Sequence, residues 1–225
     1  ASAALTGGSA VCLTGERGTG RTMLAGLMAA KSGASVVFVE CDPARRFQEQ
    51  SLVEEIRTAV ASGAPMVALH VDQLSPDAAA EAFNLLARAS AAGKLFLTAY
   101  QVGEELMRSL PGRTPLELRL PPLRSRRDDI PLLVAHFLAT DVTDRSVRAD
   151  GKLLHALAQA EWPGNVAALR DVVVSAARGS SKELLELSDL GELQQRALAR
   201  GRLSRLESAE LEQVRQALQE SNGNR

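Results

Sequence analysis

A glycine-rich octapeptide between an apolar run and a helical pattern places the strongest constraint on how this chain folds. Residues 15–22 read Gly-Glu-Arg-Gly-Thr-Gly-Arg-Thr; they follow Ala10-Val11-Cys12-Leu13 and precede a helix-like run over 23–31. The spacing is G-x-x-x-x-G-[KR]-[ST]: the glycines let backbone N–H groups turn toward a phosphate, and a helix N-terminus adds positive potential. The order of strand, loop and helix predicts a phosphate-binding P-loop; the alternative is an ordinary glycine-rich turn.

The residues of this loop are the first candidate ligands for a nucleotide. Arg21 stands where lysine is usual, and it keeps the positive charge on a longer, planar side chain. Thr22 carries a hydroxyl of the kind that binds Mg²⁺ in such loops. The predicted nucleotide-binding residues are Gly15, Glu16, Arg17, Gly18, Thr19, Gly20, Arg21 and Thr22.

The composition excludes several classes of protein. The 225 residues, of which 45% are hydrophobic, are enough for one large or two modest domains with buried cores. A net charge of −1 and an aromatic content of 3% argue against a basic or base-stacking nucleic-acid surface. No apolar run approaches the ~20 residues that span a bilayer, and Cys12 and Cys41 lack metal-ligand spacing. We therefore expect a cytoplasmic protein with reduced, buried thiols and no membrane contact.

Apolar runs of strand length alternate with helical patterns over the first half of the chain. This alternation favours a parallel sheet covered by helices on both faces, which is an α/β fold. The predicted strands are 10–14, 35–40, 66–71, 95–98 and 116–120, and the predicted helices are 22–31, 50–62 and 76–92.

After Pro121 and Pro122 the chain is helical with short breaks. The pattern predicts helices over 130–139, 151–160 and 165–178, which together form a small all-helical subdomain. One last amphipathic helix is expected over 208–220. The predicted domains are an α/β core over 1–125, a helical part over 126–190, and a linker with the final helix over 191–225.

A second candidate site follows the predicted strand 66–71. That strand leads to Asp72 and Gln73, and the carboxyl edge of the strands is where ligands bind in an α/β sheet. Asp72 is of the type that holds Mg²⁺ at the end of a Walker B strand. ATPases of this type usually carry a glutamate next, which activates the attacking water, whereas the amide of Gln73 is a very weak base. The alternative is that Asp72 only caps the following loop.

Two later motifs resemble a known family. Segment 120–138, LPPLRSRRDDIPLLVAHFL, resembles the L-P-P-L-R-E-R-R-E-D-I-P-L-L signature of bacterial enhancer-binding proteins, the AAA+ activators that work with sigma-54 RNA polymerase. Segment 162–166, Trp-Pro-Gly-Asn-Val, is similar to their W-P-G-N-V-R-E-L motif. The tail 211–225 resembles the first helix and turn of their Fis-type helix-turn-helix. The resemblance covers about residues 10–225.

The resemblance implies a P-loop AAA+ core with a parallel sheet between helices, a small all-helical lid, self-association as a dimer or ring, and a role in transcription control. Residues 15–22 would wrap the phosphates of ATP or ADP, and Thr22 and Asp72 would hold Mg²⁺. Ile130 and Leu133 would lie near the adenine. DNA would be contacted through the helix-turn-helix, of which this chain contains the first helix, and RNA polymerase is an implied partner.

The chain departs from the family pattern at several working positions. Arg21 replaces the P-loop lysine, Gln73 the catalytic glutamate, and Glu40 the asparagine that usually restrains that glutamate. Ala167 stands where W-P-G-N-V-R has its nucleotide-sensing arginine, and Tyr100 stands near the usual asparagine or threonine of the first sensor. These changes predict weak or absent hydrolysis.

Elements that contact a neighbour or the polymerase are also altered. Arg108 and Arg113 are weak candidates for the finger arginines that reach the nucleotide of a neighbouring subunit, because the family pattern around them is lost. The stretch between Cys41 and Asp72 has no G-A-F-T-G-A loop, the element that touches sigma-54. The sequence therefore predicts the central AAA+ domain of a bacterial transcriptional regulator that binds nucleotide or oligomerises, hydrolyses little ATP and does not act through sigma-54. Two alternatives stay open: an active ATPase that remodels a transcription complex, and a nucleotide-free scaffold.

Overall fold

The computed structural model describes residues 10–31, 35–41, 49–74, 81–82, 84–86, 95–101 and 116–191. Contacts divide the chain into two compact units, an N-terminal unit Ala1–Pro122 and a C-terminal unit Leu123–Arg225. None of the helices in the described ranges has the length and apolar character that a membrane span needs. Candidate residues Arg108 and Arg113, and the predicted helix 208–220, lie outside the described residues.

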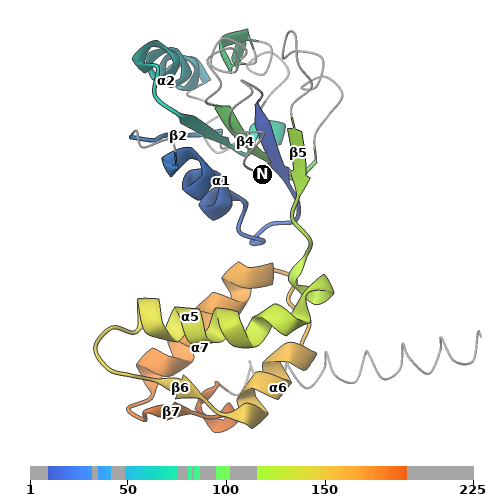
Figure 1. The fold of residues 1–225 in the computed structure, drawn as a ribbon, viewed down its shortest axis with the longest axis vertical. Helices are drawn as coiled ribbons and strands as arrows, with labels where there is room; N and C mark the ends of the chain where they lie inside the picture. Colours follow the sequence, from blue (N-terminus) through green and yellow to red (C-terminus); the bar gives the residue numbers. More distant parts are fainter. Residues whose placement is uncertain are drawn as a thin grey trace, which may run out of the picture. The chain divides into compact units, whose positions relative to one another are not determined.

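A five-stranded parallel sheet forms the centre of the N-terminal unit (Figure 1). Its strands follow the order β2-β3-β4-β1-β5, and every neighbouring pair is parallel. The predicted alternation of strands and helices is confirmed. The bounds are β1 Val11–Thr14, α1 Arg21–Ala30, β2 Val37–Glu40, α2 Glu49–Ser62, β3 Met66–Leu69, β4 Leu95–Ala99 and β5 Leu116–Arg119.

The two faces of this sheet have separate hydrophobic cores. Successive strand residues point to opposite faces, so Val11 and Leu13 of β1 pack with Ala25 of α1. Cys12, between them, packs in the other core with Ile56 of α2. A strand buried on both faces reads as a continuous apolar run, which is why the sequence pattern located these strands well.

The strand β3 ends two residues before its predicted end. His70 adopts a left-handed backbone with φ 56°, which no strand residue can have. The chain then turns through a short 3₁₀ helix, η3 Val71–Gln73. Of the predicted helix 76–92, the described residues 81–82 and 84–86 are helical, and the rest lies outside the described part of the chain.

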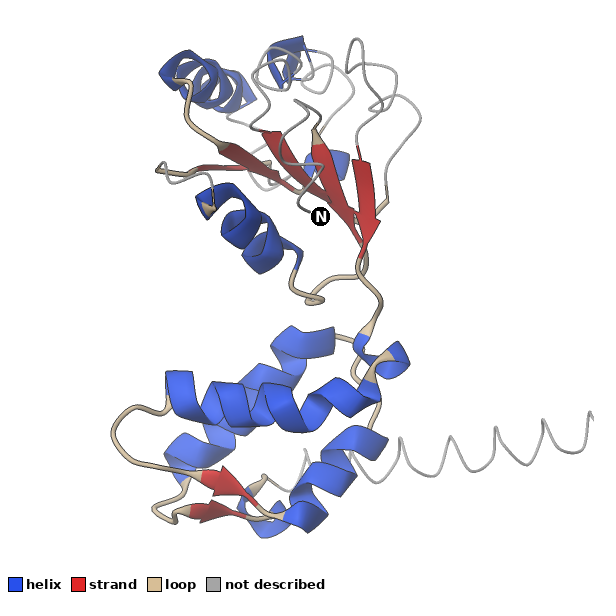
Figure 2. Ribbon diagram, viewed as in Figure 1, coloured by secondary structure: helices blue, strands red, loops and turns tan. Residues whose placement is uncertain are grey.

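The described part of the C-terminal unit, residues 123–191, contains three α-helices (Figure 2): α5 Ile130–Asp141, α6 Gly151–Gln159 and α7 Asn165–Gly179. Short 3₁₀ helices η4 Leu123–Ser125, η5 Arg127–Asp129 and η6 Leu187–Asp189 flank them. Their apolar faces meet in one core, whose fully buried members include Leu123, Ile130, Leu153, Leu157 and Leu169. The predicted helical subdomain is therefore present.

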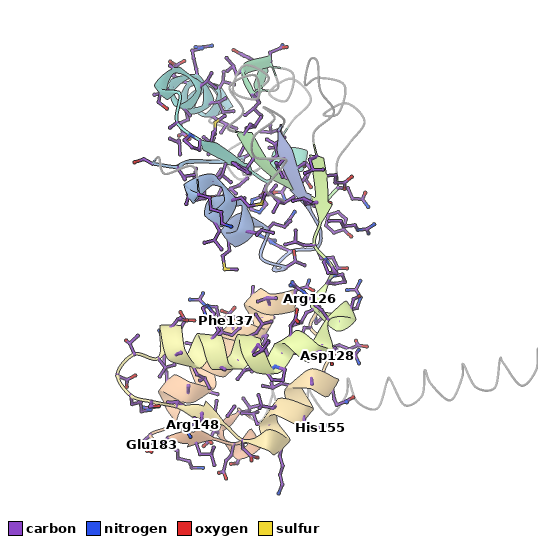
Figure 3. All side chains as sticks on the ribbon, in the orientation of Figure 1. Arg126, Asp128, Phe137, Arg148, His155 and Glu183 are labelled. Carbon is purple, nitrogen blue, oxygen red and sulfur yellow. The ribbon has the colours of Figure 1, made fainter. Side chains whose placement is uncertain are left out.

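This unit also contains a small sheet, so the prediction of an all-helical subdomain was incomplete. Strand β6 Arg148–Ala149 pairs in parallel with β7 Leu184–Leu185. The Arg148 N–H donates to the Glu183 carbonyl at 2.8 Å, and Figure 3 shows both residues at this end of the unit. Two-residue strands are too short to show a period of two in the sequence, which is why the pattern did not reveal them.

Candidate phosphate-binding site

Three glycines with positive φ shape the loop between β1 and α1. The φ angles are 142° at Gly15, 77° at Gly18 and 98° at Gly20, in a region that other residues rarely adopt. A Cβ added to Gly15 would lie 2.7 Å from the backbone oxygen of Leu120. The Gly15 N–H donates to the Tyr100 carbonyl at 3.3 Å. Glycine is therefore required at position 15 both for its backbone angle and for lack of space.

A tight turn closes the middle of this loop. The Thr19 hydroxyl donates to the backbone oxygen of Glu16 at 2.8 Å, and the Thr19 N–H is 3.4 Å from the same oxygen. Thr19 is buried, whereas Arg17 is exposed. The loop thus has a fixed interior formed by Thr19 and the backbone, with the Arg17 side chain on its outer surface.

Arg21, the first residue of α1, is a buried cation. The residue is only 7% exposed, and its Nη1 has no hydrogen-bond partner within the described part of the chain. Burial lowers the pKa of Arg21 because it removes water from the guanidinium; the Asp72 carboxylate opposes this shift, and the charge of Arg17 adds to it. A buried charged donor without an acceptor costs free energy. The oxygen of a phosphate is the type of acceptor that this donor requires.

Asp72 and Tyr100 lie together beyond the carboxyl ends of β3 and β4. Asp72 is on η3, and its Oδ2 accepts a hydrogen bond from the Tyr100 backbone N–H at 3.0 Å. Gln73 is exposed, and its backbone N–H donates to the His70 carbonyl at 3.0 Å. Asp72 therefore serves a backbone donor just past the end of β4, while its charge also acts on Arg21.

The metal-ligand candidates are more exposed than the guanidinium. Thr22, in the first turn of α1, and Asp72 are both exposed. Across the described ranges, no three His, Cys, Asp or Glu side chains gather closely enough to hold a metal ion. A magnesium ion at such a loop would take most of its ligands from phosphates and water, so Thr22 and Asp72 stay predictions.

The candidate residues of the C-terminal unit differ in burial. Ile130 is fully buried in the helical core, whereas Leu133 packs against that core and keeps part of its surface exposed. Ala167, at the position of the sensing arginine, is an exposed residue of α7. The roles of Ile130 and Leu133 near an adenine remain predictions.

The Trp-Pro-Gly-Asn motif has a clear structural role in this unit. Asn165 is fully buried with φ 51°, and its Oδ1 accepts a hydrogen bond from the Leu123 N–H at 2.8 Å. Its own N–H donates to the Trp162 carbonyl at 2.8 Å. The Trp162 indole N–H donates to the Leu157 carbonyl at 2.9 Å. The motif thus fixes the start of α7 against η4 and the end of α6.

The roles of Leu120 and Tyr100 at the loop were not predicted from the sequence, because both residues act there through backbone atoms. Leu120 limits the space at Gly15, and Tyr100 links the loop to Asp72 through its carbonyl and its N–H. Any residue type can supply a backbone group, so no sequence signal marks these positions.

Comparisons with known proteins agree with this architecture. Residues 124–205 match the AAA+ ATPase lid domain. The chain is 46% identical over 61 residues to the DNA-binding transcriptional regulator NtrC of Salmonella typhimurium, a match covering 25% of this chain and 13% of that protein. It is 31% identical over 106 residues to the propane 2-monooxygenase operon transcriptional activator MimR of Mycolicibacterium smegmatis, covering 47% of this chain and 18% of that protein.

A solved structure has the same fold over nearly the whole chain. NtrX from Brucella abortus in complex with ATP superposes with a TM-score of 0.62 at 19% identity, covering 99% of this chain and 60% of that one. The same protein in complex with ADP gives a TM-score of 0.62 at 20% identity over 83% of this chain and 50% of that one. The chain is thus much shorter than the relatives it matches. Residues 124–205 are thus similar to AAA+ ATPase lid domains, and parts of the chain are similar to bacterial transcriptional regulators such as NtrC and AlgB.

Proposed function

We propose that this chain is the central AAA+ domain of a bacterial DNA-binding transcriptional regulator, and that it binds ATP or ADP but hydrolyses little or no ATP. The observation that carries the proposal is the buried Nη1 of Arg21, which has no acceptor in the described chain and sits at the start of α1 behind a glycine loop. A nucleotide would supply phosphate oxygens to this donor and to the backbone N–H groups of the loop.

The candidate site lacks more of the groups that ATP hydrolysis needs than of the groups that nucleotide binding needs. Gln73 cannot take the proton of an attacking water, and one oxygen of Asp72 already accepts the Tyr100 N–H. An arginine finger contributes about 10³–10⁵ in rate, or about 4–7 kcal/mol, and the family pattern around the candidates Arg108 and Arg113 is lost. Ala167 also lacks the charge of the nucleotide-sensing arginine. These replacements should weaken nucleotide binding less than hydrolysis, because backbone N–H groups provide much of the contact with phosphate.

Two measurements test this proposal. Calorimetry with ATP and ADP should give micromolar binding; absence of binding would leave the nucleotide-free scaffold as the correct description. Phosphate release by the wild-type protein should equal that of an Asp72→Ala variant. A wild-type rate clearly above this control would support the active ATPase, an alternative that the charge of Arg21 and the hydroxyl of Thr22 keep open.

The relatives and the sequence support the following transcriptional partners. We expect DNA contact through the helix-turn-helix that begins near residue 208, and self-association as a dimer or ring that positions it. The missing G-A-F-T-G-A loop argues for a route to RNA polymerase that does not use sigma-54. Retention of sigma-54 on the immobilised protein in the presence of ATP would contradict this part. Sedimentation with and without nucleotide measures the self-association.

A further inference from the structure

We propose that the loop distinguishes the two nucleotides and holds ADP more tightly than ATP with Mg²⁺. This inference rests on the proposed nucleotide binding at the same loop and adds the number of phosphate groups that the loop accommodates. It follows from three features: the space taken by Arg21, the charges around the loop, and the hydrogen bond between Tyr100 and Asp72.

The first feature is the volume of the Arg21 side chain. Arg21 begins α1 and is 7% exposed, and its Nη1 is buried, so most of the side chain contacts protein and only a small part is open to a ligand. Arginine is longer than lysine and ends in a planar group with five donors instead of one compact ammonium. The guanidinium therefore fills space that lysine leaves open, and its paired N–H groups are matched to the oxygens of one terminal phosphate.

The second feature is the balance of charge. Arg17 and Arg21 are matched in formal charge by Glu16 of the same loop and by Asp72, whose carboxylate acts on Arg21. A third phosphate adds negative charge, and this charge needs a cation that the loop does not supply. Mg²⁺ usually provides it by bridging the two outer phosphates.

The third feature weakens the hold on that Mg²⁺. The Asp72 Oδ2 accepts the Tyr100 N–H at 3.0 Å, and this hydrogen bond makes the oxygen a weaker metal ligand than one without such a donor. The neighbouring Gln73 is a neutral amide and adds no charge. The diphosphate does not depend on a bridging metal, so ADP binding should change little when Mg²⁺ is removed.

The test is calorimetry on the whole chain with ADP, ATP and the non-hydrolysable β,γ-imido analogue of ATP, each with and without Mg²⁺. We expect ADP to bind at least about tenfold more tightly than either triphosphate. Arg21→Lys should bring the ADP-to-ATP ratio of affinities to about one, because lysine leaves room for the third phosphate. Arg17→Lys is the matched control: it makes the same replacement at an exposed position of the loop and should shift both nucleotides alike.

The outcomes distinguish a failure of this inference from a failure of the proposed nucleotide binding. Equal or tighter binding of ATP by the wild-type protein, or a ratio that Arg21→Lys leaves unchanged, overturns the selectivity for diphosphates alone. Absence of binding by every nucleotide overturns nucleotide binding itself. If Arg21→Lys does not fold, as judged by its melting curve, the wild-type ratio and its Mg²⁺ dependence decide.

Discussion

The side-chain oxygen of Asn165 accepts a hydrogen bond from the backbone N–H of Leu123 at 2.8 Å, which joins two residues 42 positions apart in the chain. Leu123 opens the C-terminal unit, and Asn165 opens α7 with a left-handed backbone, φ 51°. Both residues are fully buried. Asparagine suits this position because it adopts positive φ more readily than most residues and its amide can serve a backbone donor.

Replacing Asn165 should destabilise the C-terminal unit. In Asn165→Ala the buried Leu123 N–H loses its acceptor, about 1–3 kcal/mol, and the positive φ costs roughly 1–2 kcal/mol more. In Asn165→Gly only the first cost applies, so this variant should be the more stable of the two. Urea unfolding followed by the fluorescence of Trp162, the single tryptophan, measures both. Equal stability of the two variants would contradict the contribution of the backbone angle.

Replacing Gly15 should be more costly than replacing another glycine with positive φ. Gly15→Ala places a Cβ 2.7 Å from a backbone oxygen that cannot move aside easily. We expect a loss of more than ~2 kcal/mol, whereas Gly63→Ala, with φ 65° and nothing within 4 Å of its Cβ, should lose about 1 kcal/mol. Thermal unfolding by circular dichroism compares the pair, and similar losses would show that the approach of Leu120 has no effect.

The pair of Asp141 and Arg170 should make stability depend on pH in the acid range. Arg170 donates to both carboxylate oxygens, at 3.0 and 2.7 Å, and this hydrogen bonding holds the pKa of Asp141 below its usual value. The stabilisation is present above the ordinary aspartate pKa of about 4 and is lost as pH falls through the lower folded value.

The difference in melting temperature between wild type and Arg170→Ala should therefore be larger at pH 7 than at pH 3. Asp141→Asn is the control background, since its amide cannot titrate. In this background, the change in melting temperature caused by Arg170→Ala should be the same at pH 7 and pH 3. If the melting temperatures of wild type and Arg170→Ala differ by the same amount at pH 7 and pH 3, the pair does not make stability depend on pH.

The two cysteines should be unreactive in the folded protein. Burial is the largest cause that raises the pKa of Cys12 and of Cys41 to about 12. At pH 8 only about one thiol in ten thousand is then ionised, and the thiolate is the reactive form. Mass spectrometry after maleimide treatment should find no label on the native chain and two labels in denaturant. Rapid labelling of the native protein would show that a core of the N-terminal unit opens readily.

The sequence predicted the sheet well because its inner strands β1, β3 and β4 are apolar on both faces and the turns between strands and helices contain glycine or proline. It failed at His70, where a left-handed residue ends β3 early, since one histidine after an apolar run is too weak a signal for that backbone angle. It also missed the pairing of β6 with β7, which rests on two residues from each strand.

For the candidate site, residue types were easier to predict than their surroundings. The octapeptide located the loop, and Asp72 was placed correctly after β3 in the chain. That Arg21 would be enclosed and that Asp72 would accept the Tyr100 N–H depends on how separate strand ends meet. Such contacts between atoms far apart in the chain cannot be predicted from the spacing of residues in the sequence.

The close approach of Gly15 and Leu120 has a mechanical consequence. Leu120 is tied to β1 by a hydrogen bond from its N–H to the Thr14 carbonyl at 2.8 Å, and its own oxygen leaves no room for a methyl group at Gly15. The next two residues are prolines, whose φ angles are fixed, and they lead directly into the C-terminal unit. A side chain at position 15 would therefore push Leu120 away and strain its hydrogen bond to Thr14, so the first residue of the glycine loop also determines where the chain leaves β5.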